Sequence, residues 1–186
     1  QEQKSQAFLQ LNPEGVVPVL VHDDLILRES SALIAYANHL SARTSLMPKA
    51  SDAYGTTQMW LVRCIEIHAA INTLTFATFF RAMEQANRPS EETAIKLSRI
   101  ANPQIAAKRQ DLFANGTDSI YFAGALHTLR LMLSDMHSGL EKATWVAGND
   151  YSLADIALIA YVDRIERLGL GALWEKSFPN VERWLT

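Results

Sequence analysis

Two short apolar runs near the start of the chain give way to long stretches with helical periodicity. Between residues 16 and 29, the runs VVPVLV and LIL flank the turn-forming sequence His22-Asp23-Asp24. Aliphatic and β-branched runs around such a turn are typical of a β-hairpin. Two strands alone are marginally stable in water and need further strands or covering helices. No other segment reads as a strand, so we expect the partners of this hairpin to lie upstream of Gln1.

Apolar residues at helical spacing dominate the rest of the chain after the hairpin. Ser30 or Ser31 is placed to cap a first helix that extends to about Leu40. Apolar positions at steps of three to five residues predict one long helix from Asp52 to about Asn87. Further boundaries follow from start and stop signals. They are a start at Pro89-Ser90-Glu91-Glu92, an N-cap at Asn102-Pro103, a stop at Asn115-Gly116 and another helix from Ile120 to Leu140.

The last predicted helix begins with a capping signature. Ser152-Leu153-Ala154-Asp155 follows the capping-box pattern, with Asp in place of the usual Glu or Gln. Asp155 is the only charged residue from Leu153 to Val162, so this helix is expected to be apolar on nearly every side and central in a helical bundle. We interpret Ser152 and Asp155 as structural capping residues rather than as catalytic groups.

The fold class is therefore mainly α with a small α/β part. We place a partial α/β domain at residues 1–41, a polar linker containing Pro48 at residues 42–51, and an all-helical domain at residues 52–186. Only 8 glycines and 6 prolines punctuate the 186 residues, which favours long helices over many short strands.

Charge and cysteine content exclude several classes of partner. Lys and Arg number 17 against 20 Asp and Glu, and the net charge of −3 argues against nucleic acid or an anionic membrane surface as a partner. No apolar run reaches the length of a membrane span, and no cluster of His and Cys has the spacing of a metal site. The single cysteine, Cys64, fits a reducing, cytoplasmic location.

Candidate chemistry lies at the two ends of the hairpin. A cis Val17-Pro18 bond would turn the main-chain groups of Val17 outward and offer an edge to a peptide-like ligand. Where Glu29-Ser30 begins the helix, free amides and the Ser30 hydroxyl favour a carboxylate, and Glu29 can hold an ammonium group. This combination predicts a site for a zwitterionic amino-acid head group. A bulged edge strand and an ordinary serine cap would leave the same pattern.

Two segments resemble the glutathione transferase family. FLQLNPEGVVPVLVHDDLILRESSALIAYANHL resembles the second half of its thioredoxin-like glutathione-binding domain, and WVAGNDYSLADIALIAYVDRIERLG resembles its C-terminal helical signature. The resemblance implies a partial thioredoxin-like domain followed by a helical bundle. It further implies that Val17 pairs with the cysteinyl unit of glutathione, that Pro18 is the family's cis-proline, and that Glu29 and Ser30 bind the γ-glutamyl end.

The chain departs from the family pattern at two places. Val16 stands where theta-like members often carry a Lys that holds the glycyl carboxylate. The Tyr, Ser or Cys that activates the glutathione thiol follows the first strand in this family, and no segment here matches that region. We therefore expect the activating residue upstream of Gln1.

The resemblance implies an enzyme that conjugates glutathione, as co-substrate, to a small hydrophobic electrophile. The apolar stripes of the helices from Asp52 and from about Ile120 are wider than one bundle core needs and predict a homodimer. Trp60, Arg63 and Ile67 are expected to face the electrophile. The alternatives are a glutathione-dependent peroxidase or disulfide reductase, and a non-catalytic transferase-like binding protein. Cys64 is interpreted as a packed hydrophobe and His68 as a core or cleft residue without an assigned role. The aromatic residues Phe76, Phe79 and Phe80 fit either a substrate pocket or a dimer contact.

Overall fold

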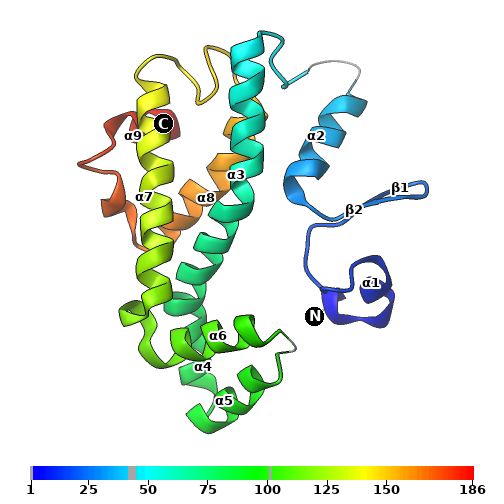
Figure 1. Cartoon of the computed structure of the whole chain (residues 1–186), viewed down its shortest axis with the longest axis vertical. Helices are drawn as coiled ribbons and strands as arrows, with labels where there is room; N and C mark the ends of the chain where they lie inside the picture. Colours follow the sequence, from blue (N-terminus) through cyan, green and yellow to red (C-terminus); the bar gives the residue numbers. More distant parts are fainter. Residues whose placement is uncertain (1, 42–44, 101) are drawn as a thin grey trace.

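A computed structural model describes residues 2–41, 45–100 and 102–186 of the chain. It is mostly helical, with one small antiparallel sheet. In the view of Figure 1, the N-terminal segment lies on one side of the long helix α3 (Ser51–Thr75) and helix α7 (Ile120–Leu140) lies on the other. The predicted fold class, mainly α with a small α/β part, is confirmed.

The N-terminal segment consists of short elements around a hairpin. They are η1 (Glu2–Lys4), α1 (Gln6–Leu11), β1 (Leu20–His22), β2 (Leu25–Leu27) and α2 (Ser30–Leu40). The strands pair antiparallel with Leu20 opposite Leu27, and Asp23 adopts a positive φ of 51° in the turn between them. Helix α1 was not predicted from the sequence.

The hairpin is shorter than predicted. Val16, Val17 and Pro18 precede β1 instead of forming its first residues. The physical reason is that Pro18 has no amide to donate to a strand partner, while the Asn12 side chain donates to the Val16 carbonyl. This stretch of main chain is thereby held as a loop.

The predicted serine cap of α2 is wrong. Glu29 is the N-cap residue, makes no side-chain capping bond, and leaves Ser30 as the first helical residue. The Ser31 hydroxyl instead donates to the Leu61 carbonyl of α3 at 2.8 Å. Ser31 thus joins the N-terminal segment to the helical part of the chain.

The long helix predicted from Asp52 to Asn87 is confirmed as one continuous helical run with an internal π turn. Helix α3 passes into the π-helical turn η2 (Phe76–Phe80) and then into α4 (Arg81–Asn87). Within this region the Thr78 hydroxyl donates to the Leu74 carbonyl at 2.8 Å. Such turns insert one residue into the helix and are frequent at functional sites.

The other helices begin close to where the sequence places them. They are α5 (Ser90–Ser98), α6 (Pro103–Asn115), η3 (Gly116–Asp118), α7, α8 (Leu153–Arg167), η4 (Gly171–Leu173) and α9 (Pro179–Leu185). The Asn102 side chain accepts from the amides of Gln104 and Ile105, so the predicted N-cap is confirmed.

The core lies where α3, α7 and α8 pack together. Its fully buried members include Leu74, Leu129, Leu133, Leu158 and Ile165. Helix α8 buries one face, but Ile159 is 38% exposed, so the expectation of a helix buried on nearly all sides is only partly met.

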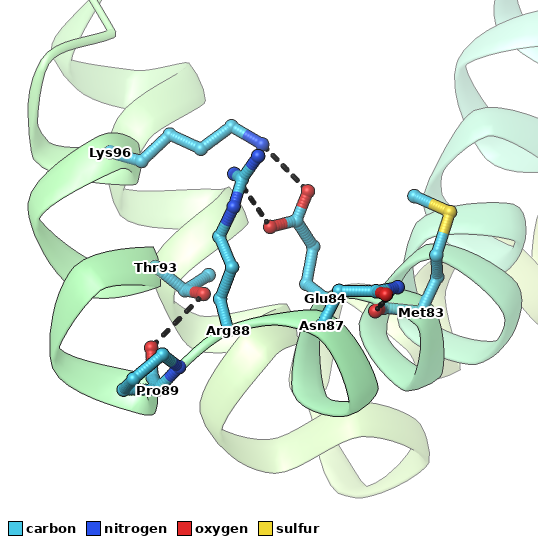
Figure 2. A network of polar contacts seen from close by, with 7 residues as sticks. All are labelled: Met83, Glu84, Asn87, Arg88, Pro89, Thr93 and Lys96. Carbon is cyan, nitrogen blue, oxygen red and sulfur yellow. Dashed lines mark hydrogen bonds and ion pairs between the residues drawn. The ribbon is translucent and has the colours of Figure 1, made fainter.

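A polar network fixes the corner between α4 and α5 (Figure 2). The Glu84 carboxylate accepts from Arg88 at 3.2 Å and from Lys96 of α5 at 2.6 Å. The buried Thr93 hydroxyl donates to the Pro89 carbonyl, which lies just before α5. These contacts hold α5 against the end of α4.

The proposed partition of the chain stays a prediction. The expected linker at residues 42–51 falls partly on residues 42–44, which lie outside the described residues, and α3 already begins at Ser51. Within the described ranges, no helix combines the length and apolar character needed to cross a membrane.

Candidate functional site

A cleft of about 620 Å³ lies between the N-terminal segment and the helices α3, α6 and α8. Its N-terminal wall is made by the loop before β1 and by the residues between β2 and α2. The residues that line it are Asn12, Pro13, Glu14, Val16, Val17, Pro18, Arg28, Glu29, Ser30, Ser31, Cys64, Ile65, His68, Asn72, Ile105 and Tyr161.

Asn12 organises the loop that carries this wall. Its side chain is 2% exposed, donates to the Val16 carbonyl at 2.8 Å and accepts from the Glu14 amide at 3.2 Å. Gly15 has a φ of +61°, a left-handed conformation that favours glycine. The Asn-Pro-x-Gly sequence of residues 12–15 is the local signal for this turn.

The loop places Val17 at the surface. The Val17-Pro18 peptide bond is cis, as expected, and Val17 is 68% exposed. Among the described residues, none forms a hydrogen bond with the Val17 amide or carbonyl. Arg28, just after β2, is joined to the end of α1, because its Nε donates to the Leu11 carbonyl at 2.8 Å.

The N-terminus of α2 forms the adjacent part of the same wall. Because Glu29 does not cap the helix with its side chain, the first-turn amides of α2 keep their free hydrogen-bonding capacity. The positive end of a helix and such amides together favour a bound carboxylate. Glu29 and Ser30 line the cleft directly at this point.

The opposite wall differs from the one that the sequence predicts. Trp60 and Ile67 are 2% and 1% exposed and belong to the core, and Arg63 donates to Asp135 of α7 at 2.7 Å. The expectation that these residues face the electrophile is therefore wrong. The helical period places them toward the bundle, and the adjacent face of α3 lines the cleft. That face carries Cys64, Ile65, His68 and Asn72.

Two neutral groups close the cleft near α8. The Tyr161 hydroxyl donates to the Cys64 carbonyl at 3.4 Å, and the rings of Tyr161 and His68 meet edge to face. Burial raises the pKa of Tyr161 to about 12 and the pKa of the Cys64 thiol to about 11. Both side chains are therefore protonated at neutral pH, and Cys64 packs as an apolar residue in the core.

The structure brings the four predicted ligand-binding residues, Val17, Pro18, Glu29 and Ser30, to one cleft. The cleft also contains His68, to which the sequence assigns no role, and Asn72, Ile105 and Tyr161, which the sequence pattern does not single out. The spacing of His68 and Asn72 is one helical turn, which could have placed both on the same face of α3.

Ser152 and Asp155 lie away from the cleft and form a capping box at the start of α8. Asp155 is fully buried and accepts from the Ser152 amide and hydroxyl, both at 2.9 Å. These hydrogen bonds cap the N-terminus of α8, as the sequence pattern predicts for both residues.

Family models match both parts of the chain. The glutathione S-transferase N-terminal domain matches residues 1–45, and the glutathione S-transferase C-terminal domain matches residues 73–186. The second match covers more than half of the 186 residues.

Individual relatives agree with these matches. The chain is 26% identical to glutathione S-transferase GstB of Escherichia coli (strain K12), over 95% of this chain and 70% of that protein. It is also 26% identical to probable elongation factor 1-gamma 1 of Arabidopsis thaliana, over 97% of this chain but only 36% of that protein. The chain therefore spans about a third of that longer relative.

Solved structures show the same fold. The crystal structure of β-etherase LigF from Sphingobium sp. strain SYK-6 superposes with a TM-score of 0.79 at 24% identity, covering 99% of this chain and 78% of that one. A glutathione transferase from Burkholderia graminis, with two glutathione molecules bound per subunit, gives a TM-score of 0.67 at 22% identity and covers 99% and 67%. With both family models matched in order along its length, the chain belongs to the glutathione S-transferase family.

Proposed function

We propose that this chain serves glutathione transfer, in which the thiolate of bound glutathione attacks a hydrophobic electrophile. The observation that carries the proposal is the convergence of the Val17 main chain, Glu29 and Ser30 on one cleft whose opposite wall contains apolar residues. The N-terminal wall has the groups needed for a peptide with a zwitterionic end. The bound glutathione of similar solved structures supports the same ligand.

Each group on the N-terminal wall has a distinct role in this proposal. The amide and carbonyl of Val17, which bond to none of the described residues, pair with the cysteinyl unit, with Pro18 shaping the loop. The first-turn amides of α2 and the Ser30 hydroxyl hold the γ-glutamyl carboxylate, and Glu29 holds the adjacent ammonium. Binding energy at this end positions the sulfur toward the helical wall.

The chemistry is thiolate attack. A free thiol has a pKa above neutrality, and a nearby donor lowers that pKa so that the nucleophilic thiolate is present at neutral pH. Cys64 does not serve as a second thiol for disulfide exchange, because burial raises its pKa to about 11. This favours conjugation over mixed-disulfide chemistry through Cys64.

A second candidate is a binding protein that uses the same scaffold without catalysis. The similarity of the chain to a protein named as a probable elongation factor supports this second candidate. Glutathione binding without turnover of any electrophile would support this candidate.

Calorimetric titration of glutathione into the parent chain and two variants tests the proposed site. Ser30→Ala removes a hydroxyl donor to a carboxylate, a charge-assisted bond worth about 1.5–3 kcal/mol, or about ten- to a hundredfold in affinity. Glu29→Gln keeps the shape but removes the charge that faces the ammonium. It should weaken glutathione and leave its des-amino analogue nearly unaffected.

Ser138→Ala is the matched control, because Ser138 is an exposed serine of α7 whose hydroxyl donates within its own helix. Its affinity for glutathione should equal that of the parent chain. Unchanged affinity in Ser30→Ala, or equal loss of both ligands in Glu29→Gln, would contradict the assigned roles.

Assembly and location are part of the proposal. We propose a homodimer, supported by exposed apolar residues on α3 and α7 that include Val62 at 66% and Leu131 at 49% exposure. A cytoplasmic location is supported by the single cysteine, which is buried and has no partner for an internal disulfide.

A further inference from the structure

Arg109 of α6 is a partly buried cation without an acidic partner in the described part of the chain. Its guanidinium lies over the Phe76 ring, 4.2 Å from the centroid, and its Nη2 donates to the Asn72 Oδ1 at 3.0 Å. Its Nη1 is buried and finds no hydrogen-bond partner among the described residues. Burial lowers the pKa of Arg109.

The contact with Arg109 fixes the orientation of the Asn72 amide. A guanidinium only donates hydrogen bonds, so the atom that faces it must be the amide oxygen of Asn72. The Asn72 Nδ2 is then left as the free end of this side chain. No hydrogen bond of Nδ2 with a described residue is formed, and Asn72 lines the cleft.

The surroundings of Asn72 combine apolar surface with hydrogen-bond donors. Ile65 lies on the same face of α3, and Ile105 lies one turn before Arg109 on α6; both line the cleft and are 63% and 50% exposed. His68 lies between Ile65 and Asn72 along α3. In the view of Figure 1, α6 lies at the lower end of α3, where it packs on the π turn η2.

We propose that Asn72, backed by Arg109, binds an anionic oxygen group, such as a carboxylate, on an electrophile whose apolar body rests on Ile65 and Ile105. The inference rests on the proposed function for the presence of an electrophile in the cleft. The Asn72 Nδ2 donates directly to the anion, and the unpaired charge of Arg109 polarises this donor and attracts the ligand. Acidic residues of the cleft, Glu14 and Glu29, lie on the opposite wall.

Binding of two unreactive probes to the full chain tests this subsite. 4-Nitrobenzoate and 4-nitrobenzamide have the same shape but differ in charge, and each is titrated calorimetrically with and without saturating glutathione. The parent chain should bind the benzoate about tenfold more tightly than the benzamide, because hydrogen bonds to a charged acceptor are about twice as strong as neutral ones. Arg109→Met should abolish that preference while keeping the apolar contacts.

Lys108→Met is the matched control, since it removes the same charge from the neighbouring residue, whose Nζ lies over the Tyr121 ring. This variant should keep the preference for the benzoate. Asn72→Leu changes an exposed residue and should lose the preference even if Arg109→Met fails to fold. Equal affinity of the parent chain for both probes, no binding of either, or equal loss in Lys108→Met and Arg109→Met would overturn the inference.

The probes also separate this inference from the proposed function. A benzoate preference that depends on Arg109 in a chain that does not bind glutathione would support the subsite and refute the proposed function. Glutathione binding with no discrimination between the probes would support the proposed function and refute the subsite.

Discussion

Asp155 shows how a single buried carboxylate can hold several segments together. Besides the two bonds from Ser152, its oxygens accept from the Val146 amide at 3.1 Å and from the Trp184 indole at 2.9 Å. The carboxylate therefore joins the start of α8 to the loop before it and to α9. Four donors converge on an acceptor-only group, which compensates for its burial.

Replacing Asp155 by Asn should destabilise the fold strongly. The amide keeps one acceptor oxygen but directs N–H groups at donors such as the Trp184 indole. We expect the free energy of unfolding to fall by about 3 kcal/mol, measured by urea denaturation. Asp163→Asn is the control, because Asp163 pairs with Arg167 at the surface and should change stability little. Similar losses in both variants would contradict a special role for Asp155.

Cys64 should react slowly with thiol reagents in the folded chain. It is 2% exposed, and burial raises its pKa from 9.0 to about 11, which reduces the thiolate fraction roughly a hundredfold at neutral pH. Alkylation by iodoacetamide at pH 7.5, followed by mass spectrometry, should be at least that much slower than for the unfolded chain in urea. Rapid labelling of the folded chain would contradict this.

The same shift links Cys64 to the pH dependence of stability. Its pKa in the folded chain is higher than in the unfolded chain, so the protonated thiol contributes stability below about pH 9. That contribution is lost as the pH rises toward 11.

At the scale of elements, two glycines have opposite roles. Gly116 follows α6 with a φ of +57° and a ψ of −121°, and a Cβ built on it would meet the Arg81 guanidinium at 3.1 Å. Arg81 is held there because its Nε donates to the Phe113 carbonyl. Gly124 lies inside α7, where a Cβ would meet nothing within 4 Å.

Alanine at these two positions should therefore shift stability in opposite directions. Gly116→Ala should destabilise by about 1–3 kcal/mol, because a side chain is strained at this φ and crowds Arg81. Gly124→Ala should stabilise by about 0.5–1 kcal/mol by reducing the entropy of the unfolded chain and favouring the helix. Thermal unfolding of both variants against the parent measures the difference, and a shared direction of change would contradict the assignment.

Helix boundaries were predictable where the signal is local. Asn102 before Pro103 and the Ser152–Asp155 box involve residues within a few positions of one another, so the sequence carries the whole interaction. The cap of α2 was not predictable in this way. Ser31 makes its hydrogen bond with Leu61, 30 residues later, and that contact exists only after the chain has folded.

At the scale of the whole molecule, the exposed apolar residues of α3 and α7 predict association. Light scattering at micromolar concentration should give a mass of about twice the 20.7 kDa of one chain. Leu131→Glu should shift the mass to that of a monomer, since it places a charge on the exposed face of α7. Ile95→Glu on α5, where the residue is also exposed, should leave the mass unchanged. A monomeric parent chain would contradict the prediction.

The candidate site divides into a part that was predictable and a part that was not. Val17, Pro18, Glu29 and Ser30 lie in two short stretches joined by a hairpin, so their order along the chain already indicates that they share a site. Trp60 and Ile67 follow helical spacing, and the sequence therefore placed them on the opposite wall. They belong to the core, and the adjacent face of α3 lines the cleft. Periodicity identifies an apolar face but does not tell which neighbour covers it.

The sequence by itself determined the mainly helical fold, the caps at Asn102 and Ser152, and the loop residues that form the N-terminal wall of the cleft, because each depends on near neighbours in the chain. Only the tertiary structure decided that Ser31 bonds to α3, that Tyr161 closes the cleft from α8, and that Arg109 meets Asn72. These pairs are 30 or more residues apart, or come from separate helices. Their contacts depend on the rotation and crossing of packed helices, which are set by the summed packing of the core.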